Sequence, residues 1–332
     1  MFPSKLKSGD EIRVIALSKS MGLISSANKT LAVKALTDLG LQVTFGSHVD
    51  ENDLMHSSSV KSRITDLHEA FADPNVKAIL TVLGGYNANQ LLSSIDYDLI
   101  KQNPKIFCGF SDITALGNAL YHKTGLVTYS GLHFSSFAMQ KGFEYSLEHF
   151  KKIFFHTDEL PLLSSKEWSD DAWYLDQDNR TFHSNSGYHV LNPGHASGTI
   201  IGGNLGTLQL LRGTPYMPNL EGTILFLEEV SAGPGADVEE FDRNLQSLIY
   251  APDFAQVQAI VIGRFETSFG MTQEKLEHLI STKPALKSFP IIANADFGHT
   301  TPIFTFPVGG TCHLQAEASG KVDLVIERNS SF

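Results

Sequence analysis

A serine that could act as a nucleophile lies at position 111, within the stretch CGFSDITAL (108–116). Residues 104–110 (PKIFCGF) predict a strand, and residues 112–125 predict a helix that ends at Gly125. A sharp strand-to-helix turn exposes a serine hydroxyl, and the first N–H groups of the helix can bind an oxyanion. The G-x-S-x-G pattern is matched only in part, because Ile113 replaces the second glycine. Ser111 suits a helix N-cap equally well, so both interpretations stay open.

A second stretch, LGGYNANQLL (83–92), places two glycines between a predicted strand and a helix. Free backbone N–H groups at such a turn could form an oxyanion hole or hold a phosphate, although an ordinary tight turn has the same pattern. No G-x-G-x-x-G follows the first predicted strand, and the sequence contains no G-x-x-x-x-G-K-[ST]. These absences argue against a nucleotide cofactor and against a P-loop.

Two more stretches carry groups that could assist a serine. Glu228 and Glu229 end the apolar run LFLEEV, where an open α/β sheet commonly places its site and where a carboxylate could orient a histidine. His299, in the turn NADFGHTTP, could act as a general base. A strand that simply ends at solvent would explain the acidic pair as well. Five other histidines have comparable local sequences, namely His122, His133, His183, His189 and His195.

The composition narrows the function classes. The chain has 332 residues and a net charge of −11, so no chain-wide positive field would attract nucleic acid. Its two cysteines, Cys108 and Cys312, form no disulfide framework and have no metal-ligand spacing, so we expect neither a metal nor a cofactor. The N-terminus has no secretory signal pattern and no stretch is long enough to span a membrane. We therefore expect a soluble, cytoplasmic protein that acts on a small molecule and uses no membrane.

The order of predicted elements indicates an α/β protein. Short apolar strands, including those near 12–18 and 76–85, alternate with amphipathic helices, including those at 25–40 and 60–74, up to about residue 131. This order is typical of a mostly parallel sheet covered on both faces. The stretch 161–195 is polar, acidic and aromatic, and it predicts a linker with a substrate-recognition loop. Strands near 197–203, 221–230, 257–265 and 289–295 and helices at 236–251 and 272–282 follow. We predict an N-terminal α/β domain (1–160) and a β-rich C-terminal α/β domain (196–332).

Five motifs, taken in order, resemble the LD-carboxypeptidase family of serine peptidases. They are GGYNANQLL, GFSDITAL, GGNLGTLQLLRGTPYMP, ILFLEE and DFGHTTP, and the resemblance runs from about residue 10 to about residue 315. The family includes muramoyl-tetrapeptide LD-carboxypeptidases and the microcin C immunity peptidases. The longer aromatic loop in the middle of this chain is similar to that of the immunity branch.

The resemblance implies a Ser-Glu-His triad made of Ser111, Glu228 and His299, with an active site between two domains. It implies an oxyanion hole formed by the backbone N–H groups of Gly85 and Asp112, and it suggests a homodimer. The implied reaction is hydrolysis of the amide bond in an aspartyl nucleotide conjugate such as processed microcin C. Release of D-Ala from murein tetrapeptide is the alternative, and a non-catalytic cleft binder ranks third.

Three residues are candidates for substrate binding. Trp168 and Trp173 lie in the aromatic stretch 166–188, and an indole can stack on a nucleobase, although either residue could instead anchor the core. Asn204 lies in the Gly-rich stretch GGNLGT, where the resemblance places it close to the site. Its role could be substrate contact or turn geometry, and the sequence leaves both open.

Overall fold

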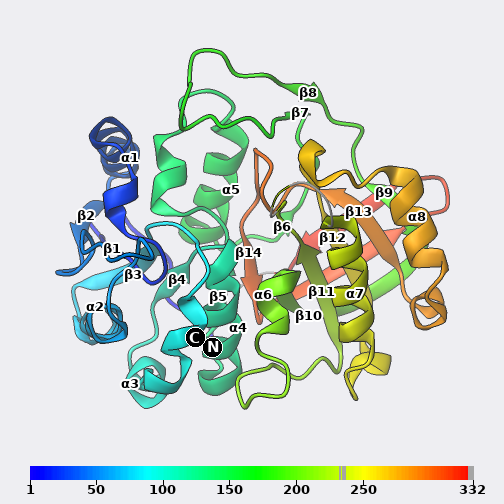
Figure 1. Ribbon diagram of the computed structural model, residues 1–332, viewed down its shortest axis with the longest axis horizontal. Helices are drawn as coiled ribbons and strands as arrows, with labels where there is room; N and C mark the ends of the chain where they lie inside the picture. Colours follow the sequence, from blue (N-terminus) through cyan, green and yellow to red (C-terminus); the bar gives the residue numbers. More distant parts are fainter. Residues whose placement is uncertain (232, 234–236, 328–332) are drawn as a thin grey trace.

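Two β-sheets lie side by side and helices flank both, as Figure 1 shows for the computed structural model. The structure describes residues 1–231, 233 and 237–327. One sheet has six strands and the other has eight, and a separate two-stranded ribbon lies at one end of the molecule. The predicted α/β fold, with a mostly parallel first sheet and a β-rich second half, is confirmed.

The six-stranded sheet is built from the first part of the chain. Its strand order is β14-β5-β4-β3-β1-β2, and all neighbours are parallel except β14 and β5. The strands are β1 (Glu11–Ile15), β2 (Gln42–Phe45), β3 (Val76–Thr81), β4 (Ile106–Cys108), β5 (Thr128–Ser130) and β14 (Phe306–Val308). Strands β3, β4 and β5 are almost entirely buried, because helices cover both faces of the sheet.

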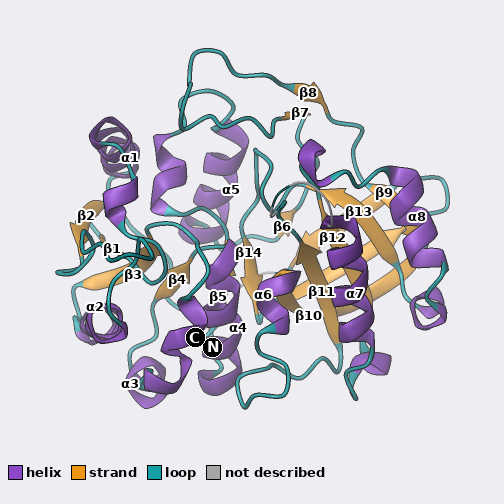
Figure 2. Cartoon of the chain, in the orientation of Figure 1, coloured by secondary structure: helices purple, strands orange, loops and turns teal. Residues whose placement is uncertain are grey.

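The order in which strands are added to this sheet determines which of its faces each helix covers. One side of the sheet carries α1 (Ser26–Asp38) and α5 (Glu144–Phe155). The other side carries α2 (Val60–Ala72), α3 (Tyr97–Gln102) and α4 (Thr114–Thr124), as Figure 2 shows. Strand addition reverses between β1 and β3, and the loops that leave these two strands diverge there. Open α/β sheets bind ligands at this kind of switch point, outside the carboxyl ends of the strands.

The eight-stranded sheet has the order β6-β16-β15-β10-β11-β12-β13-β9. Its central strands are parallel: β10 (Gly194–Asn204), β11 (Thr223–Glu228), β12 (Ala259–Gly263) and β13 (Ile291–Ala295). Antiparallel strands form its margins: β6 (Leu160–Pro161), β9 (His189–Asn192), β15 (Thr311–Ala316) and β16 (Val322–Ile326). The crossovers between these parallel strands always advance in one direction, and α6 (Leu205–Gln209), α7 (Asp237–Ile249) and α8 (Gln273–Ser281) lie on one face.

The polar stretch between β6 and β9 contains little regular structure. It forms only the ribbon of β7 (Glu167–Trp168) and β8 (His183–Ser184) before it enters β9. In Figure 1 this ribbon and its loop pass above α5 and the ends of the C-terminal strands. The boundaries at 160 and 196 remain predictions. Within the described ranges, no helix has the length and apolar character needed to cross a bilayer.

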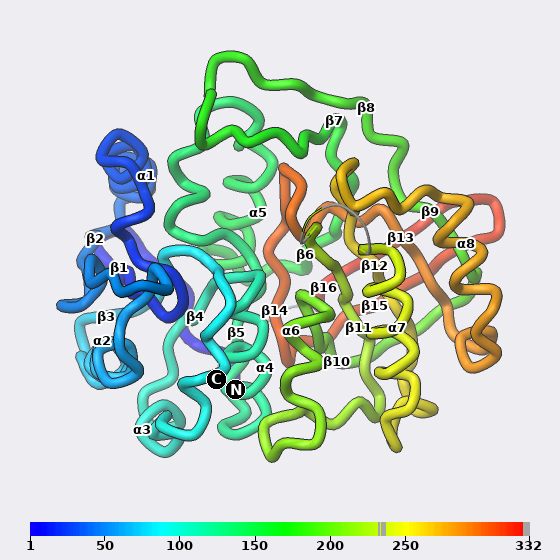
Figure 3. Tube along the Cα trace, in the orientation of Figure 1, coloured from blue at the N-terminus to red at the C-terminus, as the bar shows by residue number. Residues whose placement is uncertain are grey.

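The chain crosses between the two sheets once more near its C-terminal end. After β13 it leaves the second sheet, adds β14 to the edge of the first sheet against β5, and returns as β15, as Figure 3 shows. Phe306 of β14 packs on Phe226 of β11 and on Phe297, with ring centroids 4.8 and 5.3 Å apart. This aromatic contact joins the two sheets beneath the crossing segment, residues 296–305.

Replacing Phe306 by alanine is expected to destabilise the protein strongly. Phe306 is buried, and truncation of a buried phenylalanine typically costs about 3–5 kcal/mol in the free energy of unfolding. Urea denaturation measures this loss. Tyr250→Ala serves as the control, because Tyr250 is 73% exposed and its loss should change stability by no more than about 0.5 kcal/mol. A loss below about 1 kcal/mol for Phe306→Ala would show that the aromatic contact does not hold the sheets together.

Candidate active site

Ser111, His299 and Glu228 form a continuous line of hydrogen bonds. Ser111 Oγ lies 3.0 Å from His299 Nε2, and His299 Nδ1 lies 2.8 Å from Glu228 Oε2. Ser111 follows β4 of the first sheet, Glu228 ends β11 of the second, and His299 lies in the crossing segment. Glu228 is only 3% exposed, so the carboxylate is shielded from water. A serine, a base and an orienting acid at these distances are the elements of an activated nucleophile.

The backbone around Ser111 is strained. Ser111 has a φ of 60°, in the left-handed region that residues other than glycine rarely adopt. Gly84 makes room for it, since a Cβ on Gly84 would lie 2.9 Å from the Ser111 Cβ. Phe110, and not Ser111, is the N-cap of the turn Ser111–Ile113, and the Ser111 hydroxyl is directed to His299 Nε2. Strain of this kind costs about 1–3 kcal/mol and is concentrated at functional sites.

Two glycines let Glu228 and the crossing segment approach each other. A Cβ on Gly263 of β12 would lie 2.6 Å from the carbonyl oxygen of Phe297. A Cβ on Gly298 would lie 2.9 Å from Glu228 Oε2. Any larger residue at either position would push the crossing segment away from the end of β12, and His299 would move with it.

The charges around His299 favour its protonated form. Burial alone would lower the pKa of His299, but the charge of Glu228 and its hydrogen bond outweigh burial. Glu266 and Glu229 add to this effect, so the pKa of His299 is raised above its ordinary value. A base with a raised pKa accepts a proton from serine more readily, provided that the pH keeps it neutral beforehand.

His133 is a second histidine near Ser111, and its pKa is shifted in the opposite direction to that of His299. Burial lowers the pKa of His133 to about 3, so it is neutral at ordinary pH. Its ring stacks on Phe110 with centroids 4.1 Å apart, and its Nε2 lies 3.0 Å from the Phe110 carbonyl oxygen. His133 therefore supports the residue before Ser111. The structure does not bring His122, His183, His189 or His195 to Ser111.

Two backbone N–H groups beside Ser111 are free to bind an oxyanion. Among the described residues, none accepts a hydrogen bond from the N–H of Gly85 or of Asp112. The buried Asp112 carboxylate fixes the Gly-Gly turn, because it accepts from the N–H groups of Asn87 and Ala88 at 2.9 Å and from Ser18 Oγ at 2.5 Å. Gly85 must be a glycine here, since its φ is 154° and a Cβ would lie 2.3 Å from Ser18 Oγ.

A cavity of about 1030 Å³ opens in front of these groups. Ser111, His299, Gly85 and Asp112 line it, and Trp173 and Asn204 lie in the same wall. Trp168 is not among the lining residues. Its ring instead packs against the Arg264 guanidinium, 5.3 Å from the ring centroid, and against His183. The structure thus separates the two tryptophans that the sequence could not rank.

Asn204 is held by the protein itself. Its side-chain oxygen caps α6 by accepting from the Thr207 N–H, and its amide donates to Glu229 Oε1 at 2.7 Å. Burial and the charge of Glu228 raise the pKa of Glu229, which the hydrogen bonds from Asn204 and the Gly206 N–H partly offset. Asn204 therefore shapes the turn and also faces the cavity, so both roles considered for it are compatible with its position.

The two cysteines take no part in the line of hydrogen bonds from Ser111 to Glu228. Cys108 and Cys312 are free and buried, and burial raises the pKa of Cys312 to about 12. In the parts of the chain that the structure describes, no group of three or more His, Cys, Asp or Glu side chains could hold a metal ion.

Comparisons with known proteins identify the family of this chain. Residues 12–131 match the model of the LD-carboxypeptidase N-terminal domain, and residues 197–314 match that of the C-terminal domain. The chain belongs to the LD-carboxypeptidase family. It is therefore a member of a peptidase family, as the motif order indicated.

Individual relatives cover nearly the whole chain. YocD of Bacillus subtilis is 52% identical over 95% of this chain and 96% of its own. The structure of an MccF-like protein from Bacillus anthracis has a TM-score of 0.97 and 55% identity, and covers 99% of this chain and 100% of that one. The structure of the microcin C7 self-immunity protein MccF with aspartyl sulfamoyl adenosine has a TM-score of 0.87 and 26% identity, with 100% of both chains covered.

Sequence reasoning missed Glu266, whose charge acts on His299 although it does not line the cavity, and several residues of the cavity wall. Glu266 follows β12 as Glu228 ends β11, and this position at a strand end was the signal that could have indicated it. Tyr86, Tyr174 and Leu175 are exposed and line the mouth of the cavity. Tyr86 lies in the stretch LGGYNANQLL, but that pattern gave no role to its side chain, and Tyr174 and Leu175 lie in a loop whose path depends on distant contacts.

Glu228→Gln is expected to lower the pKa of His299. The substitution removes the charge that opposes burial and weakens the hydrogen bond to Nδ1. Histidine NMR titration measures the change, with His299→Gln used to assign the resonance. Because the folded pKa is raised, the stabilising contribution of protonated His299 is present below about pH 6.5 and is lost as the pH rises through the folded pKa. An unchanged pKa in Glu228→Gln would contradict the pairing.

Proposed function

We propose that this protein is a serine carboxypeptidase or amidase that uses Ser111, Glu228 and His299. The observation that carries the proposal is the unbroken line of hydrogen bonds from Ser111 through His299 to Glu228, at a cavity wall with two free N–H groups. A non-catalytic binder would need a cavity, but it would not need this line or the strained turn at Ser111.

The reaction follows from the placement of these atoms. His299 Nε2 takes the Ser111 proton as Oγ bonds to the substrate carbonyl carbon. The N–H groups of Gly85 and Asp112 stabilise the oxyanion, a contribution worth about 10²–10³-fold in rate for one donor. His299 then gives the proton to the leaving amine as the C–N bond breaks. Water, deprotonated by His299, hydrolyses the acyl-enzyme, and Glu228 stabilises the imidazolium in both steps.

We infer an aspartyl or related acyl nucleotide conjugate, such as processed microcin C, as the substrate class. Trp173 lines the cavity that contains Ser111, where its indole could stack on a base for about 1–3 kcal/mol. A volume of about 1030 Å³ suits a ligand of nucleotide size. The relation to the MccF structure with aspartyl sulfamoyl adenosine supports the same class. The protein would act in the cytoplasm, as its sequence leads us to expect, and as a homodimer, as the family resemblance implies.

One observation favours murein tetrapeptide as a second candidate. The described lining of the cavity contains Glu229, Asp237 and Glu240 but no lysine or arginine. An acidic wall opposes a phosphate group and attracts an ammonium group, such as that of a diamino acid in a peptide. The two candidates therefore differ in the charge that they bring to this wall.

Ser111→Ala is expected to abolish turnover while the protein remains folded. Purified wild type and variant are incubated with an aspartyl sulfamoyl adenosine-type conjugate and with a murein L,D-tetrapeptide, and mass spectrometry identifies the products. Loss of the nucleophile should lower kcat by at least about 10³-fold. Serine-dependent release of aspartate supports the nucleotide conjugate, and release of D-Ala alone supports murein. Turnover retained in Ser111→Ala would refute the serine mechanism.

Trp173→Ala is expected to raise KM for the nucleotide conjugate about tenfold or more, because the stacking surface is removed. Trp173→Phe keeps an aromatic face and should recover part of the affinity. Trp168→Phe is the matched control, since Trp168 lies outside the cavity lining and a phenyl ring can still cover Arg264. Equal KM values for wild type and Trp173→Ala would show that Trp173 does not stack on a nucleobase of the substrate.

A further inference from the structure

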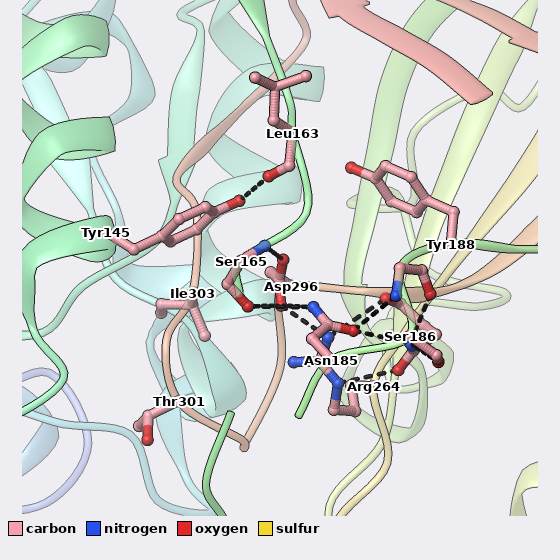
Figure 4. A network of polar contacts seen from close by, with 12 residues as sticks. Tyr145, Leu163, Ser165, Asn185, Ser186, Tyr188, Arg264, Asp296, Thr301 and Ile303 are labelled. Carbon is pink, nitrogen blue, oxygen red and sulfur yellow. Dashed lines mark hydrogen bonds and ion pairs between the residues drawn. The ribbon is translucent and has the colours of Figure 1, made fainter. Parts of the chain in front are cut away.

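Residues 166–184, here called the excursion, leave the body of the protein and return to it at one carboxylate. The Asp296 side chain accepts hydrogen bonds from the N–H of Ser165 at 2.6 Å and from Ser165 Oγ at 2.8 Å. It also accepts from the Asn185 amide at 3.4 Å. Ser165 and Asn185 flank the two ends of the excursion, and Figure 4 shows both side chains directed to Asp296. Asp296 is fully buried and lies three residues before His299.

Arg264 connects Asp296 and its hydrogen-bond partners to the second sheet. Its guanidinium lies 2.7 Å from Asp296 Oδ1 and donates through Nε to Asn294 at 2.9 Å. Asn294 in turn donates to the carbonyl oxygen of Gly187 at 2.6 Å. The ends of β12 and β13 and the returning end of the excursion therefore form one buried network (Figure 4). Loss of one partner from such a buried ion pair typically destabilises a protein by about 3–5 kcal/mol, so Asp296 itself is a poor position for a functional test.

The excursion also holds the crossing segment on the other side of His299. Ser169 and Thr301 exchange two backbone hydrogen bonds, with N···O distances of 2.7 and 2.8 Å. Thr301 lies two residues after His299, and Ser169 is fully buried. His299 is thus flanked by attachments to the excursion at Asp296 and at Thr301.

Arg180 connects this attachment to the rest of the excursion. It donates through Nη2 to Thr301 Oγ1 at 3.0 Å and through Nε to the two Asp171 oxygens at 2.7 and 3.0 Å. Its Nη1 donates to the carbonyl oxygen of Lys141 at 2.6 Å. The Arg180 side chain is only 1% exposed, yet Arg180 is not among the residues that line the cavity. The Asp171–Arg180 pair closes the tip that carries Trp173.

We propose that Arg180 is a positioning residue for His299, which it holds in place through Thr301. The crossing segment is a loop, and a misplacement of about 1 Å at a catalytic group can cost about 10²-fold in rate. The 3.0 Å contact between Ser111 and His299 therefore requires an external restraint on this loop. The excursion supplies that restraint in addition to placing Trp173 in the cavity wall. This inference rests on the proposed serine mechanism.

The test measures the reactivity of Ser111 separately from substrate binding. A small dialkyl fluorophosphonate forms a bond from phosphorus to Ser111 Oγ and releases fluoride, while His299 takes the serine proton. Such a reagent is too small to need Trp173. The second-order labelling rate is compared with kcat and KM on the preferred substrate, for wild type and for Arg180→Ala. Arg180→Lys is the conservative variant, and Lys166→Ala is the control that removes an exposed positive charge from the same excursion.

Arg180→Ala is expected to lower the labelling rate and kcat by a similar factor, about tenfold or more, with KM changed less than about threefold. Arg180→Lys should recover part of the loss, and Lys166→Ala should behave as wild type. If Arg180→Ala proves unfolded, Thr301→Val decides the matter, because it removes the hydroxyl that accepts from Arg180 and that also donates to the Ser169 carbonyl oxygen at 3.2 Å, while the two backbone hydrogen bonds to Ser169 remain. A smaller fall in labelling is expected for that variant.

Two results would overturn the inference while leaving the proposed function intact. One is an unchanged labelling rate in a folded Arg180→Ala or, failing that, in Thr301→Val. The other is a rise in KM alone, which would mean that the excursion only binds substrate. By contrast, a wild-type protein that is not labelled at Ser111 would refute the serine mechanism itself, whatever the variants do.

Discussion

The attachment of one backbone segment to two sheets is the constraint on which the site depends. Residues 296–305 leave β13 in the eight-stranded sheet and continue into β14 at the edge of the six-stranded sheet. Ser111 belongs to the first sheet and Glu228 to the second, so neither sheet contains the whole line of hydrogen bonds. The crossing segment brings His299 between them, and the packing of Phe306 on Phe226 fixes its far end.

Electrostatics and backbone geometry act together at this junction. Glu228, Glu229 and Glu266 surround His299 closely enough to raise its pKa despite its burial. That proximity exists because Gly263 and Gly298 present no side chain where the crossing segment passes over β12. The same principle operates on the other side of Ser111, where Gly84 and Gly85 let the Gly-Gly turn lie against Ser18 and Ser111. Glycines at these four positions therefore allow the ends of the strands and the loops of the site to approach one another closely.

Local sequence patterns predicted much of the fold. The strands near 12–18, 76–85 and 221–230 are short apolar runs between turn signals. In the structure β3 and β11 lie within the last two ranges, and β1 (Glu11–Ile15) overlaps the first. The helices at 25–40 and 60–74 carried clear apolar spacing and lie at α1 and α2. By contrast, no local pattern shows that β14 joins the first sheet, because that pairing depends on β5, more than 170 residues earlier.

The sequence indicated some residues of the site but not others. The motif order identified Ser111, Glu228 and His299 as a possible unit, and the structure brings their side chains together. The sequence could not rank Trp168 against Trp173, since both lie in one polar stretch and only the fold turns one of them to the cavity. It also gave no reason to notice Arg180, whose partners Asp171, Lys141 and Thr301 come from three separate segments.

The central claim is that His299, held beside Glu228, activates Ser111 as a general base. The most direct measurement is the pH dependence of fluorophosphonate labelling at Ser111 in the wild-type protein, with the modified peptide identified by mass spectrometry. The account predicts that the rate rises with pH and that its midpoint lies above about 6.5, where an unperturbed histidine titrates. A rate that does not depend on pH, or a label on another residue, would contradict it.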